Sequence, residues 1–146
     1  MNDETFIYWA VGPVDKKDMW DGDTMRVTVD FGAVLGHVIK VEDVNIRLYG
    51  INAPERKKET KERALEVRDF VWSKIGDGKR FKMRSVKTPK GHPWRKGKYG
   101  RFLMVIYFWD ESLREWVNLN WLLVSLEMAI ENFYGDKKPY WWGPHL

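Results

Sequence analysis

Residues 47–55 read Arg47-Leu48-Tyr49-Gly50-Ile51-Asn52-Ala53-Pro54-Glu55, and this stretch ends a strand and opens a turn. Apolar and polar or aromatic residues alternate over 44–49, which predicts a strand that buries one set and turns Arg47 to the other face. Gly50 and Pro54 stop the strand, and the turn closes on Glu55. A cation on a strand and a carboxylate on a turn can therefore face one pocket. The alternative is an exposed arginine and a glutamate that opens the next helix.

Turn residues and alternation predict a hairpin before this stretch. Asp21-Gly22-Asp23-Thr24 is a strong hairpin signal, and the residues after it alternate between apolar and polar through Phe31. We expect a loop over 32–36, and residues 38–41 lengthen the hairpin. The two carboxylates of the turn are also hard oxygen ligands of the kind that calcium or magnesium takes.

The remaining elements follow from periodicity. Strands are predicted at 7–14, 80–86 and 102–109, and the last of these is continuously apolar, as in a strand that is covered on both faces. Helical spacing predicts a helix over 57–74 and a second over 117–131. The predicted buried residues of the two helices are Ala64, Val67 and Val71, and Leu119, Leu122, Leu123 and Leu126.

Together these elements predict an α+β, mainly β fold. Five strands, one helix inserted after the third strand and a C-terminal helix are typical of a small OB-type barrel. We expect one domain over residues 1–134, followed by an aromatic and basic tail over 135–146. The tail could stack nucleic-acid bases, but packing back on the barrel is the interpretation we favour.

A basic loop separates the last two predicted barrel strands. Residues 87–101 hold six lysines or arginines and no acid, together with Trp94 and Tyr99. Cations interleaved with aromatic rings suit a phosphate backbone and unstacked bases, although such a run can also be a solvated surface.

Composition sets outer limits on the chemistry. The 146 residues carry a formal net charge of +4 and contain no cysteine, which excludes disulfides, thiolate metal sites and a cysteine nucleophile. Three scattered histidines lack metal-ligand spacing, and neither a P-loop nor a serine-hydrolase elbow is present. The apolar run 6–11 is too short for a signal peptide, so we expect a cytoplasmic protein without a membrane partner.

Four pieces in this order resemble the thermonuclease, or staphylococcal-nuclease-like, family. They are Asp21-Gly22-Asp23-Thr24, Arg47, Asn52-Ala53-Pro54-Glu55 and Lys98-Tyr99-Gly100-Arg101, and the resemblance covers about residues 19–129. It implies an OB-fold barrel and calcium-dependent hydrolysis of DNA and RNA phosphodiesters that leaves 3′-phosphates.

The resemblance also implies roles for eight residues. Arg47 and Arg101 match the paired arginines at the scissile phosphate, and Glu55 matches the carboxylate assigned as general base. Lys98 and Tyr99 match residues that touch a neighbouring phosphate. The three remaining positions, Asp23, Asn52 and the backbone carbonyl of Ala53, match calcium ligands.

These assignments are chemically consistent with one another. Two planar guanidiniums and a divalent cation stabilise charge that develops on phosphate oxygens, and a nearby carboxylate can deprotonate the attacking water. A calcium ion also lowers the pKa of bound water.

The chain departs from the family pattern in two respects. Asn52 offers a neutral oxygen where better-known members have an aspartate, which predicts weaker calcium binding. The segment between Asp23 and Arg47 is longer than in the compact secreted members, and an aromatic tail replaces their long last helix.

Two other classes of function stay open. A non-catalytic OB-fold module that binds nucleic acid would keep the basic loop but has no need of Glu55, Asp23 and two arginines. A structural or protein-interaction domain would use exposed aromatic residues. A monomer that acts on DNA or RNA is our leading interpretation.

Overall fold

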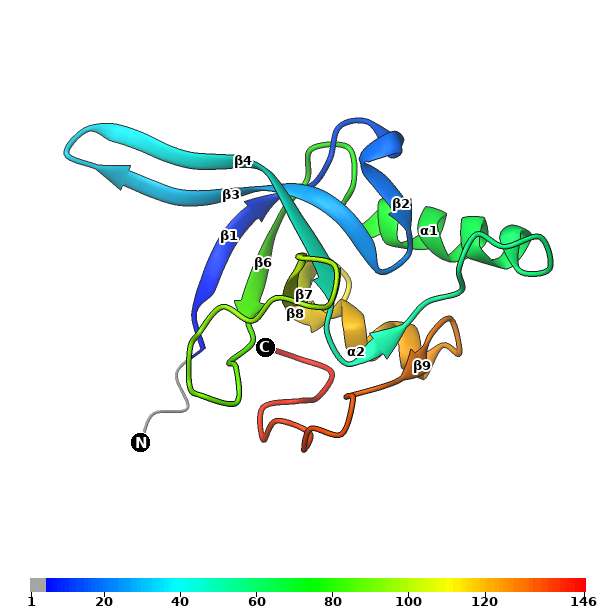
Figure 1. The fold of residues 1–146 in the computed structure, drawn as a ribbon. Coiled ribbons are helices and arrows are strands. Elements are labelled where there is room, and N and C mark those ends of the chain that lie inside the picture. Colours follow the sequence, from blue (N-terminus) through cyan, green and yellow to red (C-terminus); the bar gives the residue numbers. More distant parts are fainter. Residues whose placement is uncertain (1–4) are drawn as a thin grey trace.

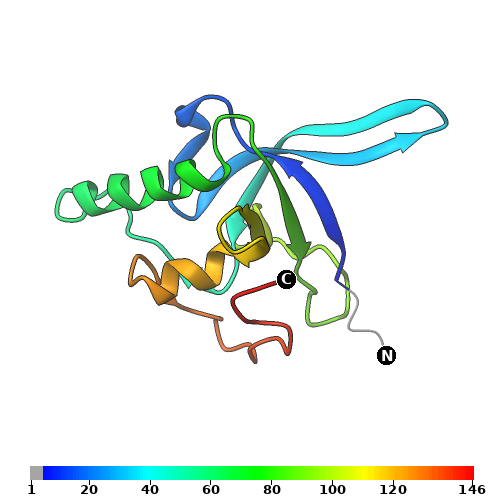
Figure 2. The same cartoon turned by 180° about the vertical axis from the view of Figure 1, so that it is seen from behind.

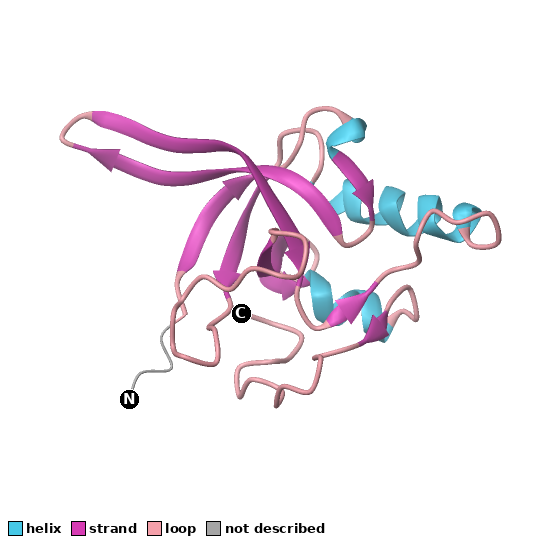
Figure 3. Ribbon diagram, in the orientation of Figure 1, coloured by secondary structure: helices cyan, strands magenta, loops and turns pink. Residues whose placement is uncertain are grey.

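The computed structural model describes residues 5–146 and consists mainly of β-strands with two α-helices (Figure 3). The described strands are β1 Ile7–Val11, β2 Met19–Asp21, β3 Thr24–Val34, β4 His37–Leu48, β5 Ile51–Asn52, β6 Arg80–Ser85, β7 Phe102–Asp110, β8 Glu115–Asn118 and β9 Ile130–Glu131. The helices are the 3₁₀ turn Lys16–Asp18, α1 Lys61–Ile75 and α2 Leu119–Ser125. The four residues that begin the predicted domain, 1–4, lie outside the described part.

Five strands close into a barrel, which confirms the coarse prediction of fold (Figure 1). The ring runs β1, β6, β7, β4, β3 and back to β1, and only the β4–β7 pair is parallel. The helix α1 follows the third barrel strand, as predicted, and covers one end of the barrel. Its residues Val67, Val71 and Ile75 are fully buried in the main core cluster with Ile46 and Phe81.

The strand β7 is covered on both faces, as its continuous apolar sequence predicts. Met104, Ile106 and Phe108 enter the barrel core, whereas Leu103, Val105 and Tyr107 enter a second cluster. The second cluster contains Phe133 and is covered by Trp116, Trp141 and Trp142. The tail therefore packs back on the barrel, as Figure 2 also shows from behind.

The hairpin of β3 and β4 is longer than predicted. The loop expected over 32–36 is wrong, because the turn occupies only Leu35 and Gly36. Both residues have positive φ, 51° and 79°, as a two-residue type I′ hairpin turn requires. Gly32, with φ 80°, lies where the register of the pair shifts, so a bulge absorbs it. The hairpin projects beyond the barrel in Figures 1 and 2.

The helix predicted over 117–131 is wrong at both ends. Its first residues form β8, which pairs with β7, and α2 stops at Ser125. The chain then turns through Glu127, which has φ 58°, and continues into β9, which pairs with β5. Leu126 is consequently 46% exposed, whereas Leu119 and Leu123 are buried as predicted.

The N-terminal end of α1 also differs from the prediction. The helix begins at Lys61 instead of residue 57, so Glu59 lies before it. Arg63 forms an ion pair with Glu66 at 3.1 Å, on the exposed face of the helix. Within residues 5–146, no helix has the length and apolar composition that crossing a membrane requires.

Candidate nucleic-acid site

One cavity of about 800 Å³ lies where the β2–β3 turn, the end of β4, the 52–57 segment and the basic loop meet. All eight residues that the sequence singled out line it: Asp23, Arg47, Asn52, Ala53, Glu55, Lys98, Tyr99 and Arg101. Asp23 and Arg101, which are 78 positions apart in the chain, thus line the same cavity. Arg47 and Glu55 line it as well, as predicted from the 47–55 stretch.

Backbone hydrogen bonds hold the acidic floor of the cavity in place. The amide of Leu48 donates to the carbonyl of Asp23 at 2.9 Å, which ties the end of β4 to the β2–β3 turn. The amide of Ala53 donates to Asp23 Oδ2 at 2.8 Å. Asp23 is 4% exposed, so these contacts fix a buried carboxylate at the base of the site.

The side chain of Arg47 connects the proposed metal ligands. Its Nη2 donates to Asn52 Oδ1 at 2.7 Å and to Asp23 Oδ2 at 3.3 Å. The Tyr134 hydroxyl also donates to Asn52 Oδ1, at 2.9 Å. Two oxygens from different elements thus converge on one positively charged nitrogen.

A second carboxyl group lies beside this convergence. Asp21 is 8% exposed, and its Oδ1 accepts the Asp23 amide at 3.3 Å. Burial, with a further contribution from the neighbouring Asp23 carboxyl group, raises the pKa of Asp21 to about 7. The β2–β3 turn therefore holds a carboxyl group that titrates near neutral pH.

The donor chemistry of this floor fits a hard cation such as Ca²⁺. Asp21, Asp23 and Asn52 offer carboxylate and amide oxygens, and the oxygens of Asp23 and Asn52 already surround a positive charge. Within residues 5–146, no three His, Cys, Asp or Glu side chains gather as a metal-binding group. A calcium ion here would need backbone, water or phosphate oxygens as well, and Arg47 would have to release the two oxygens that it now binds.

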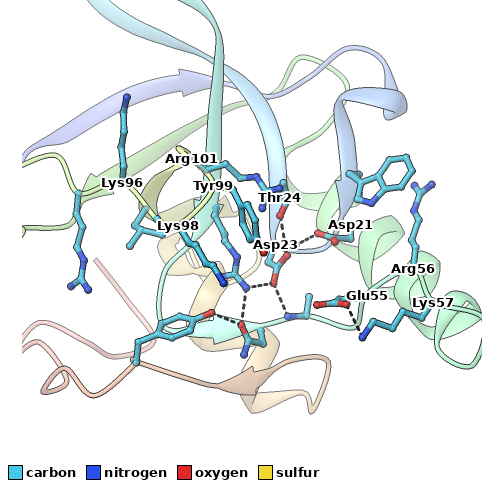
Figure 4. Close-up of a pocket in the computed structure, with 18 residues that line it drawn as sticks. Asp21, Asp23, Thr24, Glu55, Arg56, Lys57, Lys96, Lys98, Tyr99 and Arg101 are labelled. Carbon is cyan, nitrogen blue, oxygen red and sulfur yellow. Dashed lines mark hydrogen bonds and ion pairs between the residues drawn. The ribbon is translucent and has the colours of Figure 1, made fainter.

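Glu55 lies at the margin of the cavity. Its side chain is 68% exposed and forms an ion pair with Lys57, which is equally exposed, at 3.2 Å. Because exposed ion pairs are weak, this contact leaves the carboxylate free to turn. Figure 4 shows Glu55 on the same side of Asp23 as Arg56 and Lys57, with Lys96 and Lys98 on the opposite side.

The basic loop approaches the cavity through a tight turn. The Arg95 carbonyl accepts the Leu103 amide at 2.8 Å, and Gly97 donates to the Arg101 carbonyl at 2.7 Å. Gly100 has φ 78°, a conformation that favours glycine. The Arg101 guanidinium lies 5.4 Å from the centre of the Tyr99 ring, and in the described part of the chain it forms no ion pair with a carboxylate.

The other aromatic residue of the loop does not contribute to this cavity. Trp94 donates from Nε1 to the Tyr8 hydroxyl at 2.7 Å and stacks on Phe6 at 5.8 Å between ring centres. Of the two aromatic residues in the loop, Tyr99 alone lines the cavity, and it is 73% exposed.

Sequence reasoning missed several lining residues. Trp20 is 58% exposed, and the Arg56 guanidinium lies 4.3 Å from the centre of its ring. Trp20 directly precedes the 21–24 motif and Arg56 directly follows the 52–55 motif, so their positions in the sequence could have indicated that they line the cavity. Tyr134 had no such signal, because the β5–β9 pair brings it to Asn52 from 82 positions away.

A comparison of the chain with protein-family models finds no match, and a comparison with curated proteins finds none either.

Proposed function

We propose that the protein is a calcium-dependent nuclease that hydrolyses phosphodiester bonds of DNA and RNA, and that its barrel is of the OB type. The single observation that carries the proposal is the shared cavity, in which two arginines, a carboxylate at the margin and a buried carboxylate floor face one space. Phosphodiester hydrolysis needs each of these groups in a distinct role.

The arginines bind and stabilise the reacting phosphate. Arg101 has a guanidinium without a carboxylate partner in the described chain, so two of its N–H groups can engage two phosphate oxygens. Arg47 now donates to Asp23 and Asn52, and in the proposed mechanism it releases these two oxygens to the cation and turns its donors toward the phosphate. Charge that builds on the equatorial oxygens is thereby stabilised where it develops.

Glu55 orients the attacking water and accepts its proton. Its exposed position at the cavity margin lets water reach the carboxylate. A divalent cation held by Asp23, Asn52 and the Ala53 carbonyl, with Asp21 beside it, would neutralise phosphate charge and acidify water. Lys98 and Tyr99 hold a neighbouring phosphate on the far side of the cavity from Glu55.

The test is digestion of plasmid DNA and of RNA in the presence of Ca²⁺, Mg²⁺ or EDTA. We expect cleavage with Ca²⁺ that EDTA abolishes. Glu55→Gln keeps the size of the side chain but removes its basicity, so it should slow cleavage about 10²- to 10⁴-fold while nucleic-acid binding persists.

The matched control is Glu59→Gln, because Glu59 is exposed and lies outside the cavity lining. Purified in the same way, it should cleave like the wild type. Binding without cleavage in every metal would favour the non-catalytic module instead, and equal activity of Glu55→Gln and wild type would remove Glu55 from its role.

A further inference from the structure

A second, smaller hollow adjoins the candidate site. We call it the tail groove, and its volume is about 360 Å³. Arg95 lines both hollows, so the tail groove begins where the main cavity ends. In Figures 1 and 2 the tail and the basic loop lie side by side at the same end of the molecule. Its lining includes Tyr49, Arg95, Asp136, Lys137, Lys138 and Tyr140.

The tail groove is positively charged. Its lining contains four lysines or arginines and one acid, Asp136. Asp136 Oδ2 accepts from Arg95 Nη1 at 2.5 Å and from the Tyr49 hydroxyl at 2.7 Å. Burial, and then this hydrogen bond, raises the pKa of Tyr49, so the hydroxyl stays protonated and keeps donating. Asp136 therefore has its hydrogen-bonding partners within the protein. Lys137, in contrast, is exposed to solvent at the groove.

An aromatic ring stands exposed beside these cations. Tyr140 is 82% exposed, whereas the residues after it are anchored. The Arg84 guanidinium lies 4.4 Å from the centre of the Trp141 ring, and Trp142 packs edge-on against Phe133 at 5.0 Å. Trp141 and Trp142, which pack against the second core cluster, hold the backbone next to Tyr140 in place. The ring of Tyr140 is not part of that cluster.

We propose that the tail groove binds a single-stranded nucleic-acid segment that leaves the main cavity past Arg95. Lys137 contacts the phosphate backbone, and Tyr140 stacks on an unpaired base. Lys138 is paired with Glu131 at 2.9 Å, so Lys137 is the lysine of the tail that we assign to the phosphate. A paired base cannot expose its face to Tyr140, which selects single strands over duplexes. The inference deepens the proposed nuclease function and rests on it.

The experiment measures binding of fluorescent single strands of about 4 and about 16 nucleotides by anisotropy, in EDTA. We expect Tyr140→Ala to weaken binding of the long strand about tenfold and to leave the short strand unchanged. Tyr140→Phe retains the ring and should bind like the wild type. Lys137→Ala should lower the slope of log affinity against log salt by about 0.7 for the long strand.

Lys40→Ala is the matched lysine control, because Lys40 is exposed on the projecting hairpin and lines neither hollow. Equal losses on both strand lengths, no loss on either, or the same loss with a duplex of about 16 base pairs would overturn the proposal. Cleavage of plasmid DNA by the wild type is a separate readout: its absence would count against the nuclease, while the length dependence would still decide whether the groove binds single strands.

Discussion

Arg47 Nη2 lies 2.7 Å from Asn52 Oδ1, and the same nitrogen lies 3.3 Å from Asp23 Oδ2. One guanidinium therefore occupies the two side-chain oxygens that we propose as calcium ligands. Since the Arg47 side chain is only 20% exposed, water screens this contact incompletely. In the proposed function, arginine and calcium would therefore compete for the same acceptors until a phosphate draws the arginine away.

Removal of this competing cation should strengthen calcium binding in the absence of nucleic acid. We expect Arg47→Met to raise the Ca²⁺ affinity about tenfold by calorimetric titration, although the variant loses nuclease activity. Arg26→Met, on an exposed arginine outside the cavity, serves as the control. Weaker calcium binding by Arg47→Met than by the wild type would show that Arg47 supports the metal instead of competing with it.

A negative charge at position 52 should also strengthen calcium binding. Asn52→Asp replaces a neutral oxygen with a carboxylate, and calcium affinity rises with the charge of its ligands. We expect about tenfold tighter Ca²⁺ binding by titration calorimetry. The exposed Asn45 permits the same substitution outside the cavity, and Asn45→Asp should change nothing. If the aspartate at position 52 binds no tighter, Asn52 is not a ligand.

Arg101→Lys should damage catalysis although it conserves charge. A lysine ammonium cannot hold two phosphate oxygens as a planar guanidinium does. We expect kcat to fall about 10²-fold, with a smaller change in KM, while thermal unfolding stays close to that of the wild type. Arg26→Lys should leave both kinetic constants unchanged. Rates near those of the wild type for Arg101→Lys would contradict the two-oxygen contact.

Local periodicity predicts those parts of the fold whose burial is regular. The alternation in β4 predicts that Ile46 and Leu48 are buried and that Arg47 points elsewhere, as found. The spacing of Ala64, Val67 and Val71 likewise predicts the buried face of α1. Asn52 and Glu55 could be placed near Arg47 because a short turn leaves little room for them to separate.

Pairings between distant segments could not be predicted in this way. The leucine spacing of α2 continues to Leu126, but the chain leaves the helix because β9 hydrogen-bonds to β5. That pair brings Tyr134 to the cavity, and nothing in the sequence near Tyr134 indicates it. Trp94 is a second example, since its partner Tyr8 lies 86 positions away on β1 and holds the ring away from the cavity.

Asp21 should make stability depend on pH. Its carboxyl pKa rises from the usual 3.8 to about 7 in the folded chain, because of burial and then of the adjacent Asp23. Between these two values the folded chain keeps a proton that the unfolded chain releases, so the free energy of unfolding decreases as pH rises through this window. Between pH 4 and neutral pH, the free energy of unfolding of Asp21→Asn should therefore rise by about 1–3 kcal/mol relative to that of the wild type. Urea unfolding in EDTA at the two pH values measures this difference.

Asp43→Asn is the matched control for this measurement. Asp43 is exposed and has φ 55°, a conformation that asparagine also tolerates. Its pH dependence should follow that of the wild type. Parallel curves for Asp21→Asn and the wild type would mean that Asp21 ionises in the folded chain at its ordinary pKa.

Asn120 should contribute to stability and to the position of the site. It is fully buried on α2, where its Nδ2 donates to the carbonyls of Tyr49 and Met104 at 2.8 and 3.1 Å. Its Oδ1 accepts the Ile106 amide at 3.1 Å. Asn120→Leu matches the volume but leaves these buried backbone groups short of partners, so urea unfolding should show a loss of about 3 kcal/mol. Asn45→Leu, at an exposed position, should cost far less.

Because Tyr49 leads directly into the 50–55 turn, Asn120→Leu should also loosen the alignment of Asn52 and Glu55 and reduce cleavage at temperatures where the variant is still folded. A loss of stability below about 1 kcal/mol would mean that water or a shifted backbone replaces all three hydrogen bonds.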